Sequence, residues 1–429
     1  MPQEYKKEKV KGIMDKNKKK ELLETVAHGL DITPEMYNKA EKAVGEITAY
    51  LTSIESSLKI YKQGSFNLGT IVRPYKRDRK GDYDVDLVVE FNYDKKTVNS
   101  SIIKGRLGEY LKSLSYREYL DDEGRRCWTL IYPTTNGNYV TSTFHIDLLP
   151  CVPESDDIKS EIKPEVYQNT AIAITHISDK RTRPYTYKWR TSNPNGFAKW
   201  FNDLDYSKYS PLKRLDRQRV FNANKYLFES VESVGDDYTR SPLQMVIQIL
   251  KRHRDVMYAN TEREAYKPIS IIITTLVGKI VEENNLVTNN TYELLNDILK
   301  GLEYYASLQN QGITSDYADE YKTKQLIHKS IVNGKVKWKI KNPANSGENL
   351  ADKWCEDSTY ATEFFRWVKK ARNDLVDILD GAKPAEIIAK LKDCLGEDIG
   401  YLLEKFDFAE TVAPRPVMIN SGISKPYRL

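Results

Sequence analysis

The segment that most constrains this chain runs from residue 64 to residue 91 and reads GSFNLGTIVRPYKRDRKGDYDVDLVVEF. Near its end, Asp82, Asp84 and Asp86 alternate with Tyr83 and Val85. Alternate side chains of a strand share a face, so the pattern predicts a strand with carboxylates on one side and apolar groups in a core. Carboxylates this close repel one another unless a divalent cation lies between them. Oxygen ligands of this kind suit Mg²⁺, which proteins hold with one or two carboxylates and substrate phosphates.

A Gly-Ser pair, Gly64 and Ser65, opens the same segment at the end of a helical pattern. Its backbone N–H groups and its hydroxyl can hold phosphate oxygens. A basic loop at residues 76–81 (KRDRKG) follows, and it could either face a triphosphate or be solvated. Phosphoryl and nucleotidyl transfer needs positioning and cations more than covalent help from the protein. The segment therefore predicts a metal-dependent nucleotidyl-transfer centre.

Gly64-Ser65 followed by Asp84-Val85-Asp86 on a strand resembles the signature of the polymerase-β-like nucleotidyltransferase superfamily. The resemblance implies a third carboxylate on a later strand, and Asp147 in FHIDLLP (residues 144–150) has flanks at strand-like spacing. We assign Asp84 and Asp86 to both of two ions, Mg²⁺ or Mn²⁺, and Asp147 to the ion that lowers the pKa of the acceptor hydroxyl. His145 shares the face of Asp147 and is expected to pack or to support a ligand.

Two alternatives to this assignment stay open. Asp82 and Asp84 fit the same pattern one step earlier, although the family pattern and the apolar run at residues 87–89 favour Asp84 and Asp86. Inward-pointing charges can also protect a strand edge against aggregation. That second reading leaves both the Gly-Ser pair and the FHIDLLP strand unexplained.

The longer string GSFNLGTIVRP is similar to one branch of the superfamily, the bacterial cGAS/DncV-like nucleotidyltransferases (CD-NTases) of CBASS anti-phage systems. Further matching stretches bring the resemblance to roughly residues 40–380: SNPNGFAKWF from Ser192, LQMVIQILKRHRDVMY from Leu243, PISIIITTL from Pro268 and NPANSGENLADKW from Asn342. The resemblance implies an α+β fold, with a polymerase-β-like core of mixed sheet and flanking helices and a mainly helical lobe like that of the oligoadenylate synthetases. It also implies that Lys251 and Ser270 contact the donor triphosphate, although a surface lysine and a helix-capping serine are equally open.

Three regions are expected. Residues 1–155 would hold an N-terminal helix and the catalytic core, residues 156–405 a helical lobe that closes the donor nucleotide cleft, and residues 406–429 a C-terminal tail. The lysine-rich residues 1–22 are expected to be solvated. Thr33-Pro34 is typical of a helix start. Later, residues 292–331 look helical and residues 335–340 look like a short strand.

Charge and cysteine content exclude several classes of protein. The net charge of +5 is too small to mark a dedicated nucleic-acid binder. The four cysteines form no Cys-x-x-Cys pair, which argues against a structural zinc site and suits a reducing cytosol: Cys127, Cys151, Cys355 and Cys394. No apolar run approaches the length of a membrane span, and the N-terminus lacks the apolar core of a signal peptide. A cytoplasmic protein with no membrane partner is therefore expected.

The function that the resemblance implies is the synthesis of a cyclic di- or trinucleotide second messenger for anti-phage defence, with loss of pyrophosphate. Its expected partners are nucleoside triphosphates, a downstream effector reached through the product, and regulatory CBASS proteins. The chain has no zinc-ribbon insertion of the kind found in the animal DNA sensor, so activation by nucleic acid is not expected. Two alternatives remain: a linear oligonucleotide synthetase or an enzyme that adds nucleotides to RNA or protein, and an inactive nucleotide-binding sensor or scaffold. The complete set of aspartates argues against the second.

Overall fold

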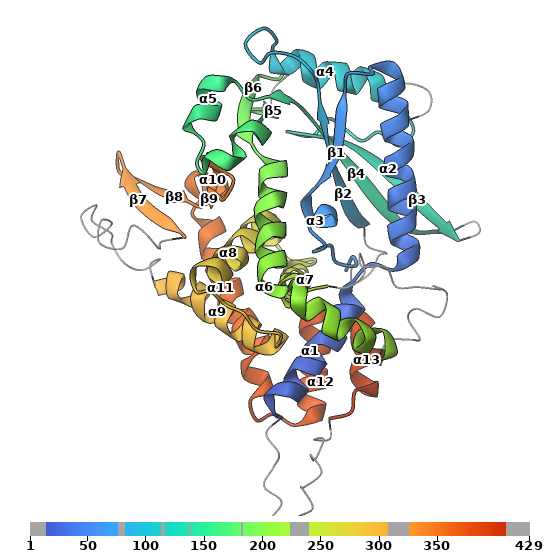
Figure 1. The fold of residues 1–429 in the computed structure, drawn as a ribbon, viewed down its shortest axis with the longest axis vertical. Coiled ribbons are helices and arrows are strands. Elements are labelled where there is room, and N and C mark those ends of the chain that lie inside the picture. Colours follow the sequence, from blue (N-terminus) through green and yellow to red (C-terminus); the bar gives the residue numbers. More distant parts are fainter. Residues whose placement is uncertain are drawn as a thin grey trace, which may run out of the picture.

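The computed structural model describes residues 14–75, 82–112, 116–136, 139–181, 183–223, 240–307 and 326–408. The chain forms a sheet-containing lobe and a mainly helical lobe, each with its own apolar core (Figure 1). The α+β prediction, a mixed sheet with flanking helices followed by helices, is thereby confirmed. The basic loop at residues 76–81 and most of the predicted tail lie outside the described residues.

Six strands of the described chain form one mixed sheet with the order β1-β2-β4-β5-β6, and β3 pairs with the first part of β4. β2 and β4 are parallel, and the other pairs are antiparallel. The strands are β1 (Lys59–Gln63), β2 (Asp82–Glu90), β3 (Trp128–Asn136), β4 (Tyr139–Pro153), β5 (Ile172–Ile177) and β6 (Tyr187–Ser192).

One face of this sheet is covered by α2 (Pro34–Ile54) and α4 (Ser100–Leu111). Val85, Leu87 and Val89 of β2 are buried against these helices, so the aspartates between them lie on the opposite face. The predicted start of α2 is confirmed, because the Thr33 hydroxyl accepts a hydrogen bond from the Met36 N–H at 3.2 Å and proline follows as the first helical residue.

The helical lobe packs around α7 (Pro242–Tyr258), whose first turn is closed by a capping box between Ser241 and Gln244. Figure 1 shows α6 running from the sheet towards this lobe. Its other helices are α1 (Lys16–Leu30), α6 (Pro194–Ala223), α8 (Ser270–Glu283), α9 (Thr291–Ser307), α10 (Asp352–Glu356), α11 (Thr359–Leu375), α12 (Pro384–Leu395) and α13 (Gly400–Lys405). The short helix α5 (Asp156–Glu161) follows β4.

Two hairpins also belong to the C-terminal half. They are β7 (His328–Val332) with β8 (Lys335–Lys339), and β9 (Lys341–Asn342) with β10 (Asn345–Asn349). The predicted strand at residues 335–340 is therefore present. The predicted helix at residues 292–331 is wrong at its end, because residues 328–332 pair as a strand.

The sheet and the N-terminal helix differ from the expected division of the chain. The sheet continues beyond residue 155. β5 pairs with β4, with Ile172 opposite Pro153, and β6 pairs with β5. The helix α1 packs in the core of the helical lobe through apolar residues such as Leu22 and Val26. Part of the expected solvated tail is thus buried: Lys19 is 5% exposed, and its ammonium group pairs with Asp380 and donates to the Tyr292 hydroxyl at 3.3 Å.

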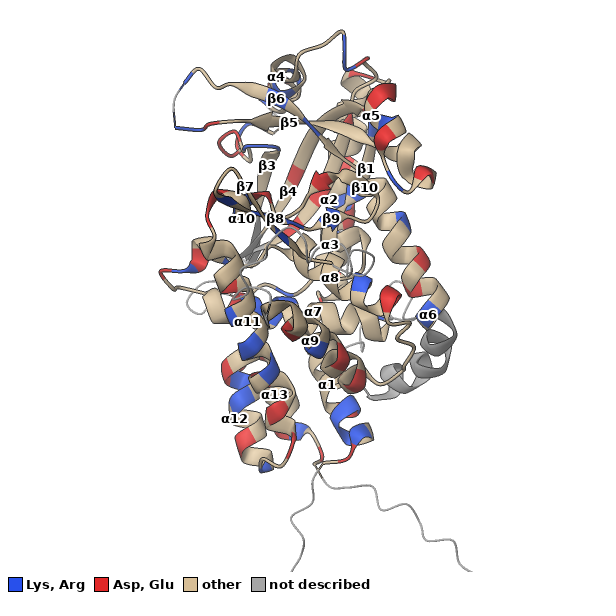
Figure 2. Cartoon of the chain, turned by 90° about the vertical axis from the view of Figure 1, so that its left-hand side faces the viewer, with Lys and Arg blue, Asp and Glu red and all other residues tan. Residues whose placement is uncertain are grey.

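Charged residues of both signs are interspersed over α11 and α12 (Figure 2). This mixture agrees with the small net charge of the whole chain. Among the described residues no helix is both long enough and apolar enough to cross a bilayer.

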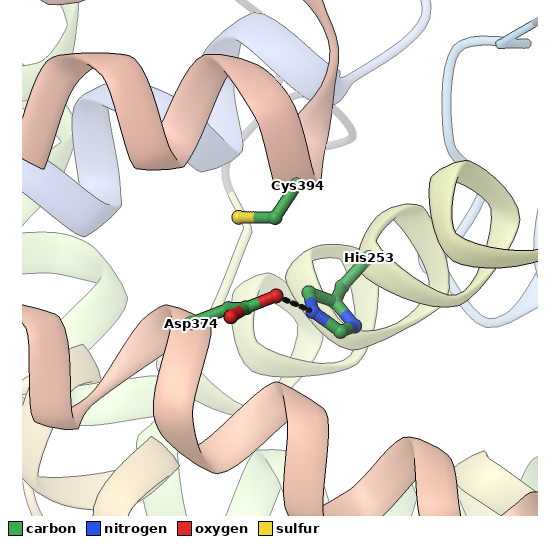
Figure 3. A group of neighbouring side chains, drawn as sticks. All are labelled: His253, Asp374 and Cys394. Carbon is green, nitrogen blue, oxygen red and sulfur yellow. Dashed lines mark hydrogen bonds and ion pairs between the residues drawn. The ribbon is translucent and has the colours of Figure 1, made fainter.

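A buried polar cluster joins α7, α11 and α12, and it contains His253, Asp374 and Cys394 (Figure 3). The three potential ligand atoms lie within 4.8 Å of one another, a spacing that would also fit a metal ion. However, the Trp367 indole N–H donates to His253 Nδ1 at 3.1 Å, so the ring proton is on Nε2, which lies 3.2 Å from Asp374 Oδ2.

The remaining groups of this cluster are also satisfied. Asp374 is paired with Lys370 at 2.8 Å and with Lys390 at 2.9 Å. Burial, and then the neighbouring Asp374 carboxylate, raise the pKa of the Cys394 thiol, which disfavours the thiolate that a metal requires. The cluster is therefore a hydrogen-bonded structural network.

We expect Asp374→Asn to lower the free energy of unfolding by about 2–3 kcal/mol, because two lysines lose their ion-pair partner at a buried site. Urea unfolding of the purified protein measures this change. The exposed neighbour Asp393 on α12 provides the control, and Asp393→Asn should stay within about 0.5 kcal/mol of the parent. A zinc ion bound at this cluster, with loss of stability on chelation, would contradict the assignment.

Candidate active site

The predicted carboxylates come together on the face of the sheet opposite α2 and α4. In the parallel pairing of β2 with β4, Asp86 lies beside Asp147 and Asp84 lies beside His145. His145 Nδ1 is 3.4 Å from Asp84 Oδ1. Asp82 lies beside Thr143, farther from Asp147, and its side chain is outside the described residues. The geometry thus favours Asp84 and Asp86 over the earlier register.

Gly64 allows the backbone to approach this acidic group closely. Gln63 at the end of β1 pairs with Asp86, and the chain then turns into the short helix α3 (Gly64–Asn67). Gly64 has a φ of +67°, and a Cβ atom there would lie 2.2 Å from Asp86 Oδ2. Ser65 is half-buried beside it, and its carbonyl closes the turn by accepting the Thr70 N–H at 3.0 Å. A glycine is therefore required where the backbone meets the carboxylate.

The acidic group carries an electrostatic penalty. Burial, and then the carboxylates of Asp147 and Asp84, raise the pKa of Asp86 to about 7, while Lys251 opposes the rise. Burial also raises the pKa of Asp147, and the hydrogen bond from Thr129 opposes that rise. Carboxylates that raise one another's pKa are ligands of the kind that a divalent cation binds, and a bound cation would remove the penalty.

Thr129 is a contact of the acidic group that the sequence did not reveal. Its hydroxyl donates to Asp147 Oδ1 at 2.6 Å from the neighbouring strand β3. Groups that hold a metal-binding carboxylate in this way fix its orientation. Cys127, the residue before this strand, lines the same cleft as Asp147, and burial raises the pKa of its thiol to about 11.

Lys251 reaches the acidic group from the helical lobe. It is 5% exposed, and its ammonium group donates to the Thr70 carbonyl at 2.8 Å. Burial, and then the charge of Arg254, lower its pKa to about 8, while Asp255, Asp86 and Asp84 oppose the change. Lys251 is thus buried, and its ammonium group is directed at the turn after Ser65. The alternative, that Lys251 lies on the surface, is wrong.

Ser270 is the first residue of α8, and its hydroxyl accepts a hydrogen bond from Arg254 Nη1 at 2.9 Å. It makes no side-chain capping bond at this helix start, where Ile269 is the capping residue. Arg254 therefore connects Ser270 to α7, three residues after Lys251. The two residues predicted to contact triphosphate are held on adjacent helices.

A cleft of about 960 Å³ lies beside this group, and it is lined by Gly64, Asp86 and Asp147 but not by Asp84, Ser65, Lys251 or Ser270. Both lobes line it. Its sheet side includes Asp86, Asp147, Ile174 and Arg190, and its helical side includes Phe197, Ile271 and Glu348. Phe197 also belongs to the buried core of the helical lobe.

We expect Gly64→Ala to lower the free energy of unfolding by about 2 kcal/mol, because the new methyl group meets the Asp86 carboxylate at a positive φ. Gly45→Ala in the middle of α2 is the matched control, since its Cβ would meet nothing within 4 Å. That variant should be more stable than the parent by about 0.5–1 kcal/mol. Both values come from urea unfolding.

The origin of the cost at Gly64 is tested by repeating the substitution in an Asp86→Ala background. There the clash is removed, and the cost should fall to the backbone strain alone, about 1 kcal/mol. An equal cost in both backgrounds would contradict the contact between Gly64 and Asp86.

The raised pKa of Asp86 predicts a pH-dependent response to metal. Between pH about 4 and 7 the Asp86 carboxyl keeps its proton in the folded protein but loses it in the unfolded chain. The contribution of Asp86 to the free energy of unfolding therefore falls as the pH rises through this range. Mg²⁺ binds the deprotonated carboxylate, so its stabilising effect should grow from pH 6 to pH 8. Melting temperatures with and without Mg²⁺ measure this effect, and Asp86→Asn should abolish the difference. A Mg²⁺ effect independent of pH would contradict the prediction.

Comparison with known proteins shows which proteins this chain resembles in sequence and in fold. The family model for the cyclic GMP-AMP synthase DncV-like nucleotidyltransferase domain matches residues 58–150, which include Gly64, Asp84, Asp86 and Asp147. A c-di-GMP synthase of Roseivirga ehrenbergii is 26% identical over 382 residues, covering 88% of this chain and 81% of that protein.

Solved structures show the same architecture over most of the chain. The CD-NTase CdnG of Bradyrhizobium diazoefficiens, in complex with GTP, has a TM-score of 0.60 at 18% identity and covers 90% of this chain and 97% of its own. CdnC of E. coli MS115-1, in complex with HORMA-deltaN, has a TM-score of 0.53 at 12% identity and covers 87% of this chain and 97% of its own. The predicted resemblance is confirmed: the chain is a nucleotidyltransferase, and its residues 58–150 match the model of the DncV-like nucleotidyltransferase domain.

Proposed function

We propose that this enzyme joins ribonucleoside triphosphates into a cyclic di- or trinucleotide. In each step a ribose hydroxyl of one nucleotide attacks the α-phosphorus of another, a P–O bond forms, and the bond to pyrophosphate breaks. The observation that carries the proposal is that Asp86 and Asp147 pair side by side next to Gly64 in a cleft lined by both lobes, with Asp84 on the same face of β2. Its volume lies near the upper end of the range of about 300–1,000 Å³ typical of small-molecule sites.

The three aspartates are the residues that would hold two Mg²⁺ or Mn²⁺ ions. Their crowding and the raised pKa of Asp86 support this role, because carboxylates this close require a cation to remain ionised together. Bound ions would supply acidity to the attacking hydroxyl and neutralise charge on the leaving pyrophosphate. Thr129 orients Asp147, and His145 supports Asp84.

The triphosphate of the donor would lie between the Gly64–Ser65 turn and the helices α7 and α8. There the backbone N–H groups of the turn can bind its oxygens, and Lys251 can neutralise them as a point charge. Ser270 is placed on the neighbouring helix to add a hydroxyl contact. These contacts would align the α-phosphorus with the attacking hydroxyl, which is most of what such a reaction requires.

The relatives support a cyclic product and a role in signalling. One is a c-di-GMP synthase, and another was solved with GTP bound. We propose that the product acts as a second messenger in anti-phage defence, read by a separate effector, and that the enzyme works in the cytoplasm, where its substrates are made. A protein partner that regulates the enzyme is part of the same proposal, since CdnC forms a complex with HORMA-deltaN.

The proposal is tested with four labelled ribonucleoside triphosphates, Mg²⁺ or Mn²⁺, and phosphatase treatment of the products. A cyclic product has no terminal phosphate and survives. Asp84→Ala with Asp86→Ala should reduce it at least about 100-fold, because the ion-binding carboxylates are lost. Asp156→Ala with Asp157→Ala removes the same charge from the exposed first turn of α5 and should leave the yield unchanged.

Products that phosphatase degrades completely would instead favour a linear synthetase or a nucleotide-adding enzyme. No product with either metal would favour an inactive sensor. A double aspartate variant as active as the parent would show that the reaction takes place elsewhere.

A further inference from the structure

Glu348 lies in the same cleft as Asp86 and Asp147 but takes no part in the acidic group. It is the fourth residue of β10, and its carboxylate is held by two donors. Asn342 Nδ2 donates to Oε2 at 2.8 Å, and the Ser192 hydroxyl lies 3.2 Å from Oε2 and 3.3 Å from Oε1. These contacts fix the carboxylate at the cleft wall and leave lone pairs free, since a carboxylate can accept about four hydrogen bonds.

The elements behind Glu348 are rigidly connected. Asn342 is 5% exposed, and its Oδ1 accepts the Ala344 N–H at 2.8 Å, so its amide nitrogen must be the atom that faces Glu348. The hairpin is tied to the sheet by Asn345, whose side chain donates to the Thr191 hydroxyl at 2.9 Å. Burial raises the pKa of Glu348, and the bonds from Asn342 and Ser192 oppose that rise.

Glu348 differs from the neighbouring carboxylate in the cleft. Asp352 is neutralised by two arginines, because its Oδ2 lies 2.6 Å from Arg190 Nη1 and 3.5 Å from Arg126 Nη2. In the part of the chain that the structure describes, no lysine or arginine forms an ion pair with Glu348. Glu348 is therefore a fixed, half-buried acceptor at the wall of the cleft; it forms no ion pair within the described residues, although the charge of nearby Arg126 lowers its pKa.

Such an acceptor suits one nucleobase. Guanine presents two neighbouring donors, N1–H and the 2-amino group, which can bond to the two oxygens of one carboxylate in parallel. Adenine presents an unprotonated N1 at the same place, which would face the carboxylate with a second acceptor. A site built to accept hydrogen bonds rejects a ligand that lacks the donors, because its polar atoms are then left unpaired.

We propose that Glu348 reads the base of a bound nucleotide and selects guanine over adenine. This inference rests on the proposed nucleotidyl transfer in the same cleft. Ser192 and Asn342 act as positioning residues that present the carboxylate. The enzyme's substrates would therefore include GTP.

The test measures binding rather than catalysis. The full chain is dialysed to equilibrium with non-reacting α,β-methylene analogues of GTP, ITP and ATP in Mg²⁺. The parent should prefer the GTP analogue over the ATP analogue by at least about tenfold, with the ITP analogue in between because it keeps N1–H and lacks the 2-amino group. Glu348→Gln should reduce the GTP-to-ATP ratio at least about tenfold without weakening the ATP analogue.

Two controls accompany this test. Glu262→Gln, at an exposed glutamate outside the cleft, should keep the parent's ratio. Ser192→Ala keeps the carboxylate and removes one donor behind it, so it should lower the ratio by a smaller factor. The inference is overturned if the parent does not prefer the GTP analogue, or if folded Glu348→Gln keeps the parent's preference.

The outcomes also separate the two proposals. Base discrimination that depends on Glu348, without any pyrophosphate release from real triphosphates, would contradict the proposed reaction and leave the base reading intact. If the enzyme makes a cyclic product but its Glu348→Gln variant keeps the parent's base preference, the base reading is contradicted and the proposed reaction stands.

Discussion

Side chains of α7 bind the carbonyl groups of the segment after the Gly-Ser turn, and the geometry of the cleft depends on these bonds. The donors lie on one stripe of the helix, and the pairs are Gln244 with Leu68, Gln248 with Ile71 and Lys251 with Thr70, at 2.9, 2.8 and 2.8 Å. Arg252 adds a bond to the Arg73 carbonyl at 2.8 Å. Because loops of this kind have carbonyls with no partner in secondary structure, buried donors on the helix are needed to satisfy them. The same bonds fix the helical lobe to the sheet, so that Lys251 faces the acidic group.

The second constraint is the charge imbalance within that group. Asp84, Asp86 and Asp147 lie on neighbouring strands. The ammonium group of Lys251, whose charge lowers the pKa of Asp86, already donates a hydrogen bond to the Thr70 carbonyl. The site therefore holds more negative charge than the protein neutralises, which bound divalent cations could balance. The polar cluster around His253 is different, because there the hydrogen bonds and lysine partners satisfy every member. The difference between the aspartate group and the His253 cluster is therefore one of charge balance, since the His253 cluster is neutralised and the aspartate group is not.

The sequence predicted the carboxylates because they stand on strands with strict alternation, and the parallel register then brings them together. Thr129 could not be found in this way. A two-residue turn after Asn136 would place Trp128 opposite Asp147, but an irregularity between Thr134 and Thr135 shifts the register by one residue and brings Thr129 there instead. The strands β5 and β6 were missed because the residues around them are mostly polar, although β5 itself, IAITHI, is largely apolar and wholly buried. Glu348 gave no local signal, since its role depends on partners more than 150 residues away, such as Ser192.

A metal centre formed by Asp84, Asp86 and Asp147 would be visible in anomalous diffraction from crystals grown with Mn²⁺ and a non-reacting GTP analogue. We expect Mn²⁺ peaks with the oxygens of all three aspartates within about 2.5 Å and the triphosphate beside Gly64. Mn²⁺ bound only elsewhere, for example between His253, Asp374 and Cys394, with the three aspartates uncoordinated, would contradict it.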